Sequence, residues 1–212
     1  MNLTRTFNQI GKSCGIFTLV IASNLFNKNS IKIKEYNNIL VKCIENNYTF
    51  IGEVFDINQL LLISKKMFPL LKCEVHNINS SDDIDKYLLQ GLIILPIDKD
   101  NIPHYILLKL NNNKIKAYNN FPNIYPNSKE LYALNKCISN NFIWTEDIIN
   151  PSSKDIFITV TAAYIISFST GKYVKKYYSD ILKKSVIKNK LNVGYKSNVN
   201  MNGKCILVTK PN

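Results

Sequence analysis

The sequence predicts an α+β fold in which N-terminal helices pack on an antiparallel β-sheet. Up to Gly91, apolar residues recur at intervals of three and four, which is the spacing of amphipathic helices. After Gly91 the pattern changes to short apolar runs separated by polar turns, which is typical of strands. The chain has 212 residues, a length at which one domain buries about 70% of its unfolded surface. We therefore expect a single domain over residues 1–212.

Four helices are expected in the first part of the chain. The first begins at Ser13 or Cys14, because residues 16–26 are strongly apolar at helical spacing. The third begins at Asp56, where Asp56 and Gln59 have the spacing of a capping box, and it ends at Pro69. The second and fourth helices are expected from residue 36 to residues 46–47 and over residues 80–90.

The strands are expected mainly in the second part. Residues 92–97, 105–110 and 114–118 form an antiparallel meander, and residues 204–209 form a terminal strand. A short strand is also plausible at residues 73–75, ahead of the meander. Residues 155–169 are rich in β-branched and aromatic side chains, so we expect one long or two short buried strands there.

The net charge of +12, from 27 basic and 15 acidic side chains, predicts attraction to acidic partners. Nucleic acid, a membrane surface and an acidic peptide all qualify. Residues 172–190 contain seven lysines and one aspartate, with apolar side chains at helical spacing, which fits a basic amphipathic helix. Such a helix can be a solvated face or a binding surface.

The five cysteines are odd in number and widely scattered, and only two histidines accompany them. This pattern supports neither a disulfide framework nor a zinc site, so we expect a reducing compartment and no metal or organic cofactor. The sequence also shows no signal peptide and no apolar run of about 18 residues. We therefore expect a soluble, cytoplasmic protein without a membrane span.

Cys14 is the candidate nucleophile. A thiol at a helix N-terminus meets unpaired N–H groups and the positive end of the helix dipole, so we expect its pKa to be lowered towards or below neutrality. Gln9, five residues earlier, has a side chain that can donate a hydrogen bond to a developing oxyanion. The alternative is that Cys14 is a buried packing residue, as free cysteines often are.

His104 is the candidate base, because it lies at the start of the middle strand of the meander. Asn119 or Asn120, at the end of the next strand, would hold the imidazole through a side-chain oxygen. Each has a plainer interpretation, since His104 can be a half-exposed packing residue and asparagine is a common turn residue. The other histidine, His76, lies in a polar stretch and is the weaker candidate.

The order of these parts, cysteine, histidine and then asparagine, resembles that of papain-like thiol enzymes. The segment Gln-Ile-Gly-Lys-Ser-Cys-Gly, starting at Gln9, resembles the Gln-x-Gly-x-x-Cys-Gly motif of the actin maturation proteases, a papain-like group related to the C39-type peptidases. Four further stretches resemble the same family in the same order, at residues 47–55, 89–98, 103–106 and 203–210.

The resemblance implies a papain-like cysteine peptidase fold and an aminopeptidase that removes an N-acetylated residue from the N-terminus of immature actin. Its site residues would be Cys14, His104, Gln9 and Asn119, its partner a protein substrate and not nucleic acid. Two alternatives stay open. One is an inactive papain-like binding module that uses residues 172–190 to bind acidic protein, nucleic acid or anionic lipid. The other is a cysteine enzyme for another acyl substrate, such as another blocked N-terminus or a lipidated glycine.

Overall fold

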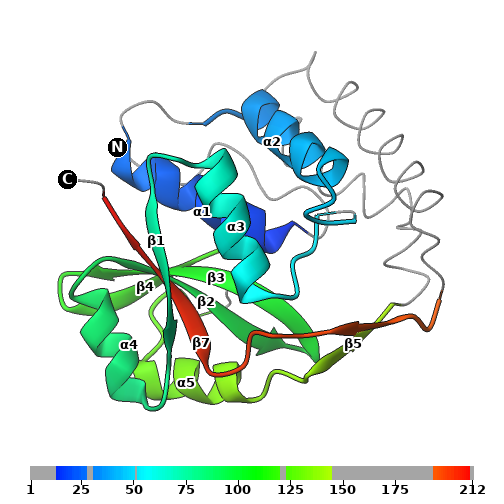
Figure 1. The fold of residues 1–212 in the computed structure, drawn as a ribbon. Helices are drawn as coiled ribbons and strands as arrows, with labels where there is room; N and C mark the ends of the chain where they lie inside the picture. The colour runs from blue at the N-terminus through cyan, green and yellow to red at the C-terminus, as the bar shows by residue number, and fades with distance from the viewer. Residues whose placement is uncertain (1–12, 28–30, 51, 120–122, 145–192, 211–212) are drawn as a thin grey trace.

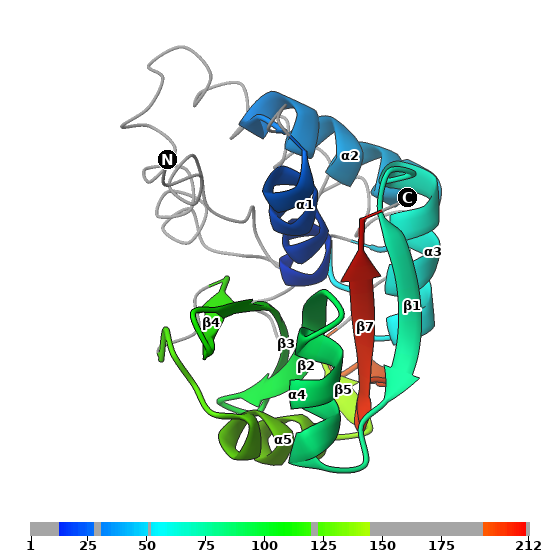
Figure 2. The same ribbon diagram turned by 90° about the vertical axis from the view of Figure 1, so that its left-hand side faces the viewer.

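The computed structural model describes residues 13–27, 31–50, 52–119, 123–144 and 193–210. Within these residues, five strands form one antiparallel sheet in the order β1-β7-β2-β3-β4. In Figure 2, β4 on the left and β1 on the right lie at opposite edges of this sheet. Its strands are β1 (Lys72–Asn77), β2 (Leu92–Lys99), β3 (Ile102–Asn111), β4 (Lys114–Tyr118) and β7 (Lys204–Thr209).

Helices cover both faces of the sheet (Figure 1). On one face lie α1 (Cys14–Phe26), α2 (Ile33–Glu45) and α3 (Ile57–Met67), with α1 packed on β3 and α3 on β1. On the other face lie α4 (Ser81–Leu88) and α5 (Ser128–Lys136), both packed on β2. A separate two-stranded sheet pairs β5 (Asn141–Ile143) with β6 (Lys196–Asn198).

The sheet divides the core into two layers, because successive side chains of a strand point to opposite faces. In β3, Tyr105 and Leu107 pack in the layer under α1, α2 and α3, while Ile106 and Leu108 pack in the layer over α4 and α5. All four side chains are completely buried. A strand that is apolar on both faces reads as a continuous run, which is how the sequence shows it.

The predicted α+β class is confirmed, with N-terminal helices on an antiparallel sheet. The four predicted helices, the meander β2-β3-β4 and the terminal strand are all present. Only one half of the capping box predicted at Asp56 and Gln59 is present. The Asp56 side chain accepts from the Asn58 amide at 2.9 Å, but the Gln59 side chain donates to the carbonyl of Tyr48 at 3.1 Å.

Several features differ from the expectation or lie beyond what the structure tests. Helix α5 and strands β5 and β6 were not predicted, and β7 lies between β1 and β2, which no local pattern indicates. The predicted strands at residues 155–169 and the basic helix at residues 172–190 lie outside the described residues. Among the helices that the structure describes, none is long and apolar enough to cross a membrane.

Candidate active site

Cys14 is the first residue of α1, as the sequence predicts, and Ser13 is its N-cap. The Ser13 hydroxyl forms a buried hydrogen bond with the Tyr36 hydroxyl of α2 instead of capping α1. This bond ties the start of α1 to the neighbouring helix. Ser13 is completely buried, whereas the residue Cys14 is only partly buried.

The Cys14 thiol lies beside β3, at the point where β4 ends. Strand β4 stops at Tyr118, which pairs with Leu107, so Tyr105 has no partner from β4. The Tyr105 main-chain amide instead lies at the thiol and lowers its pKa, as do the amides of Gly15 and Cys14 itself. The start of α1 therefore occupies the edge of β3 that the shorter β4 leaves open.

The expectation of a lowered thiol pKa is wrong. Burial raises the pKa of Cys14 to about 11, and the negative charge of Glu53 raises it further, although the three main-chain amides act in the opposite direction. Desolvation favours the neutral thiol more strongly than the helix N-terminus favours the thiolate. The resting Cys14 is consequently a neutral thiol at physiological pH.

His104 is held by the main chain of Asn119. Its Nε2 lies 2.9 Å from the Asn119 carbonyl oxygen. A carbonyl oxygen can only accept, so Nε2 carries the proton and Nδ1 keeps the free lone pair. Burial lowers the pKa of His104 below its ordinary value of 6.5, with a further contribution from the positive charge of Lys99, so the ring is a neutral base at pH 7.

Asn119 connects the histidine to the start of α1. Its side-chain amide donates to the carbonyl of Tyr105 at 2.7 Å and to the carbonyl of Cys14 at 3.3 Å. Its φ of 75° turns the chain away from the end of β4, a conformation that asparagine tolerates better than most residues. The contact to His104 thus comes from the main-chain oxygen of Asn119, whereas the sequence suggested a side-chain oxygen.

The loop that contains Thr49, Gly52 and Glu53 also packs against the start of α1. Gly52 has a φ of 116°, and a Cβ on it would lie 3.0 Å from the Cβ of Ser13, so both the conformation and the contact require glycine. Thr49 fixes this loop, because its hydroxyl donates to the carbonyl of Glu53 at 2.6 Å and accepts from the amide of Gly52 at 2.9 Å. The buried Glu53 carboxylate is thereby placed near the Cys14 thiol.

Residues 4–105 match the family model described as actin maturation protease-like, C-terminal domain. These residues are thus similar to the actin maturation protease-like family. The match spans just under half of the chain and contains Gln9, Cys14 and His104, whereas Asn119 lies beyond it. No curated protein and no solved structure matches the chain. The suspected family is confirmed, and its name indicates a protease that acts on a protein.

Three of the four residues that the resemblance implies for the site lie among the described residues, and main-chain atoms link them. The Asn119 carbonyl accepts from the His104 ring, and the Asn119 side chain donates to the main-chain carbonyl of Cys14, 90 positions before the histidine. Gln9 and the alternative residue Asn120 lie outside the described residues. Among the described residues, no group of histidine, cysteine and acidic side chains has the arrangement of a metal site.

Two neighbours of Cys14, Tyr105 and Glu53, were missed by sequence reasoning. The Tyr105 ring packs under Gly15, where a Cβ would lie 3.0 Å from the ring atom Cδ2. The Tyr105 hydroxyl is buried without a hydrogen-bond partner in the described part of the chain. Glu53 was noted only as part of a family motif. Tyr105 could have been identified from the sequence because it directly follows His104, the candidate base.

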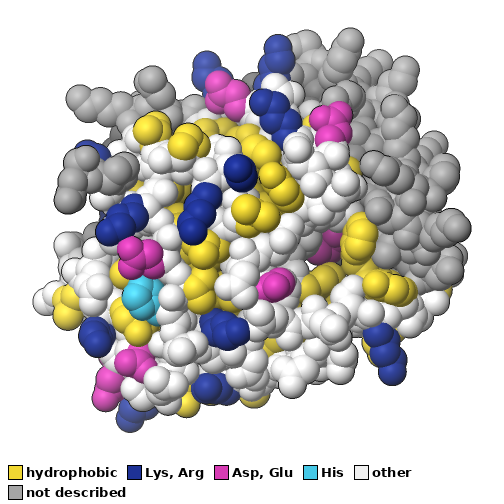
Figure 3. Space-filling model, viewed as in Figure 1, with side chains coloured by type: hydrophobic (Ala, Val, Ile, Leu, Met, Phe, Trp, Pro, Cys, Tyr) yellow, Lys and Arg dark blue, Asp and Glu magenta, His cyan; other side chains and the backbone are white. Residues whose placement is uncertain are grey.

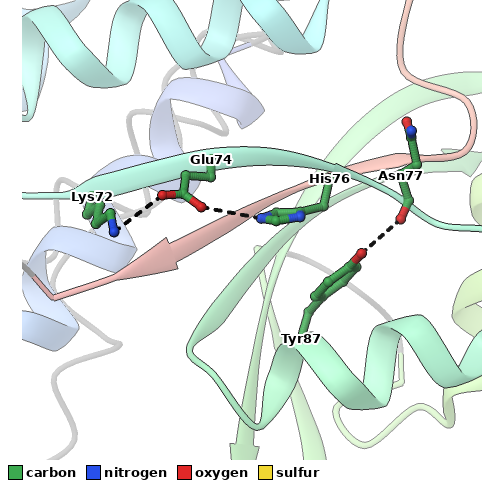
Figure 4. A network of polar contacts seen from close by, with 5 residues as sticks. All are labelled: Lys72, Glu74, His76, Asn77 and Tyr87. Carbon is green, nitrogen blue, oxygen red and sulfur yellow. Dashed lines mark hydrogen bonds and ion pairs between the residues drawn. The ribbon is translucent and has the colours of Figure 1, made fainter.

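His76 lies elsewhere in the fold, in β1, although the sequence placed no strand at that position. Figure 4 shows its ring between Glu74 and Tyr87. The Nε2 atom of His76 is 3.6 Å from the Glu74 carboxylate, which is also 3.4 Å from the ammonium of Lys72. His76 is thus part of a network of polar contacts on the edge strand β1 and does not accompany Cys14.

Proposed function

We propose that the chain is a cysteine-type aminopeptidase that removes an N-acetylated residue from the N-terminus of immature actin. The observation that carries the proposal is a pair of hydrogen bonds of Asn119: its main-chain carbonyl accepts from the ring of His104, and its side-chain amide donates to the main-chain carbonyl of Cys14. The family match supports a protease and a protein substrate. We further propose that residues 1–212 form a single papain-like cysteine peptidase domain, and that the enzyme acts in the cytoplasm.

In the proposed reaction, the neutral His104 takes the proton of the Cys14 thiol on Nδ1 while the sulfur attacks the acyl carbon of the N-acetylated residue. Since the pKa of the thiol is raised and that of the imidazole is lowered, proton transfer accompanies attack instead of preceding it. Nε2 keeps its hydrogen bond to the Asn119 carbonyl throughout, so the ring has one defined orientation.

The tetrahedral oxyanion needs hydrogen-bond donors at the start of α1. The main-chain amides of Cys14 and Gly15 lie close to the sulfur, and the side chain of Gln9 would add a third donor. Collapse breaks the peptide bond, and the protonated His104 gives its proton to the leaving amine. Water then attacks the thioester with His104 again as base, releasing the N-acetylated amino acid and the free thiol.

The proposal is tested with a panel of synthetic peptides that share one actin N-terminal sequence. The first peptide is N-acetylated, the second has a free amine, and the third carries the same residue pair internally. Mass spectrometry should detect release of the N-acetylated residue from the first peptide only. Cleavage of the internal pair at a similar rate would exclude an aminopeptidase. A fourth peptide carries another blocked N-terminus, and its cleavage without cleavage of the actin peptide would change the substrate.

The raised pKa of the Cys14 thiol favours one alternative, an inactive papain-like scaffold that binds an acidic protein, nucleic acid or anionic lipid through residues 172–190. This alternative predicts that no peptide in the panel is cleaved. It also predicts binding that weakens steeply with added salt and is indifferent to Cys14→Ala.

A further inference from the structure

We propose that the β3-β4 hairpin carries a docking surface for an extended acidic peptide segment, formed by Lys109, Lys114 and Lys116. We call these three residues the hairpin lysines. The surface is independent of the chemistry at Cys14, and it is distinct from the basic segment at residues 172–190.

The first observation is that Lys109 and Lys116 lie directly opposite each other on neighbouring antiparallel strands. Residues in such positions have Cα atoms about 5 Å apart, and like charges there are unfavourable. No carboxylate of the described residues forms an ion pair with any of the hairpin lysines. Within the described part of the chain, this pair of like charges is therefore not relieved by a carboxylate.

The second observation is that the three side chains share one face of the hairpin. In β4, Lys114, Lys116 and Tyr118 alternate with the buried Ile115 and Ala117, which face the layer of α4 and α5. Lys116 pairs with Lys109 across the strands, so Lys109 lies on the same face as the other two lysines. This is the face of the sheet on which α1 packs, towards the β4 edge that Figure 2 shows on the left.

The third observation is the local order of the surface. The Lys116 ammonium lies 5.2 Å from the centre of the Tyr118 ring, a cation–π contact that restrains the side chain on this face. Lys114 is exposed, and Lys109 and Lys116 are partly exposed. A charged side chain that is already restrained loses less conformational entropy on binding than a free one.

The face that carries β1 and α3 has a different charge pattern. Figure 3 shows Asp and Glu side chains interspersed with Lys over the face that carries β1 and α3. On β1, Lys72 and the carboxylate of Glu74 form an ion pair at 3.4 Å. A surface of mixed sign favours solubility, whereas a surface of one sign attracts partners of the opposite charge.

The spacing of the hairpin lysines indicates the shape of the partner. Lys114 and Lys116 are two residues apart on one strand, a repeat of about 6.8 Å. An extended peptide repeats its side chains on one face at the same interval, so acidic residues at alternate positions would face these lysines. Lys109, beside Lys116, would add a second cation to one of the carboxylates.

The test measures binding of a fluorescent eight-residue peptide with aspartate at alternate positions, by anisotropy, to the full chain carrying Cys14→Ala. This substitution prevents turnover if Cys14 is a nucleophile, so binding is measured whether or not the proposed function holds. We expect saturable binding that weakens with added salt, and at least tenfold weaker binding of the same peptide with asparagine in place of aspartate. Equal binding of the two peptides, or no binding of either, would overturn the proposal.

A triple variant with glutamine at the hairpin lysines should weaken binding about tenfold, because each exposed ion pair contributes little by itself and three are lost together. A control variant of the same net charge has glutamine at three exposed lysines of α2, α3 and α5: Lys34, Lys65 and Lys129. If this control weakens binding equally, net charge alone attracts the peptide and the proposed surface is wrong.

Tighter binding of an oligonucleotide or an anionic vesicle through the hairpin lysines would assign the surface to another class of partner.

A single variant separates binding from stability. Lys109→Glu places a carboxylate opposite Lys116 and leaves the contact between Lys116 and Tyr118 in place. The thermal unfolding temperature should therefore rise, while affinity for the aspartate peptide falls. If the lysines are retained for stability alone, replacing Lys109 should lower the unfolding temperature. That result, or unchanged affinity in Lys109→Glu, would contradict the proposed surface.

Discussion

Replacing Asn119 by glycine and by alanine tests the role of this residue most sharply. Both variants lose the donors to Tyr105 and Cys14, at 2.7 and 3.3 Å, and leave buried carbonyl oxygens without that partner. The loss of these hydrogen bonds should lower the free energy of unfolding by about 1–3 kcal/mol in each variant. Any difference between the two variants then comes from the main chain alone.

The φ of 75° at Asn119 sets the sign of that difference. A left-handed conformation costs alanine about 1–2 kcal/mol and glycine almost nothing. Alanine recovers about 0.4–1 kcal/mol because it has less conformational freedom in the unfolded chain. We therefore expect Asn119→Gly to be more stable than Asn119→Ala by about 0.5–1 kcal/mol, the reverse of the usual order of these two residues.

Urea unfolding of the two variants at equal m-values measures this difference. For a chain of this size, 1 kcal/mol corresponds to about 2–4 °C in the unfolding temperature. Both variants keep the main-chain carbonyl that accepts from Nε2 of His104. Because only glycine adopts a φ near 75° without strain, Asn119→Gly should hold this carbonyl in place better and retain more peptide cleavage than Asn119→Ala. Equal or greater stability of the alanine variant would refute the argument from the left-handed conformation.

Three further predictions concern the groups around the thiol. Since the pKa of Cys14 is raised to about 11 and Cys137 is exposed, iodoacetamide at pH 8 should label Cys137 before Cys14; the opposite order in peptide mapping would mean an activated thiol. Since burial lowers the folded pKa of His104 below 6.5, cleavage should stay constant from pH 8 to 6.5 and fall only under more acidic conditions. The contribution of the neutral His104 ring to the free energy of unfolding should also fall in acid. This contribution is complete above pH 6.5 and is lost as the pH falls through the folded pKa. Urea unfolding at a series of pH values measures it, and an equal loss of stability in acid for His104→Gln would contradict this assignment. Gly15→Ala should destabilise the chain by about 1–2 kcal/mol, because the new Cβ would lie 3.0 Å from the buried Tyr105 ring and the gain in helix propensity offsets only part of the overlap; unchanged thermal unfolding would show that the ring can move.

Local patterns of apolar residues in the sequence predicted much of the fold. The apolar stripe after Cys14 and the runs on both sides of His104 predicted α1, β2 and β3, because burial against one or two layers leaves a periodic signal in the sequence. The place of β7 between β1 and β2 leaves no such signal, since it depends on pairing across more than 100 residues. Helix α5 is short and its sequence is mostly polar, which resembles a loop when read alone.

For the candidate site too, the sequence predicted the features that depend on local residues and not those that depend on the tertiary structure. Residue types and their order pointed to Cys14, His104 and Asn119, and the structure connects these three through Asn119. The pKa of the thiol was predicted in the wrong direction, because the helix N-terminus is visible in the sequence whereas the burial that opposes it is a property of the tertiary structure. The main-chain contact to His104 was also beyond the sequence, since it depends on the left-handed turn at the end of β4.

The most direct test of the central claim compares two cysteine variants on actin that carries its acetylated N-terminal residue. Cys14→Ala removes the proposed nucleophile, and Cys137→Ala removes an exposed thiol of α5's C-cap as the matched control. Intact-mass measurement should show loss of the N-acetylated residue with the unchanged chain and with Cys137→Ala, and no loss with Cys14→Ala. Processing by Cys14→Ala at the rate of the unchanged chain would contradict the account.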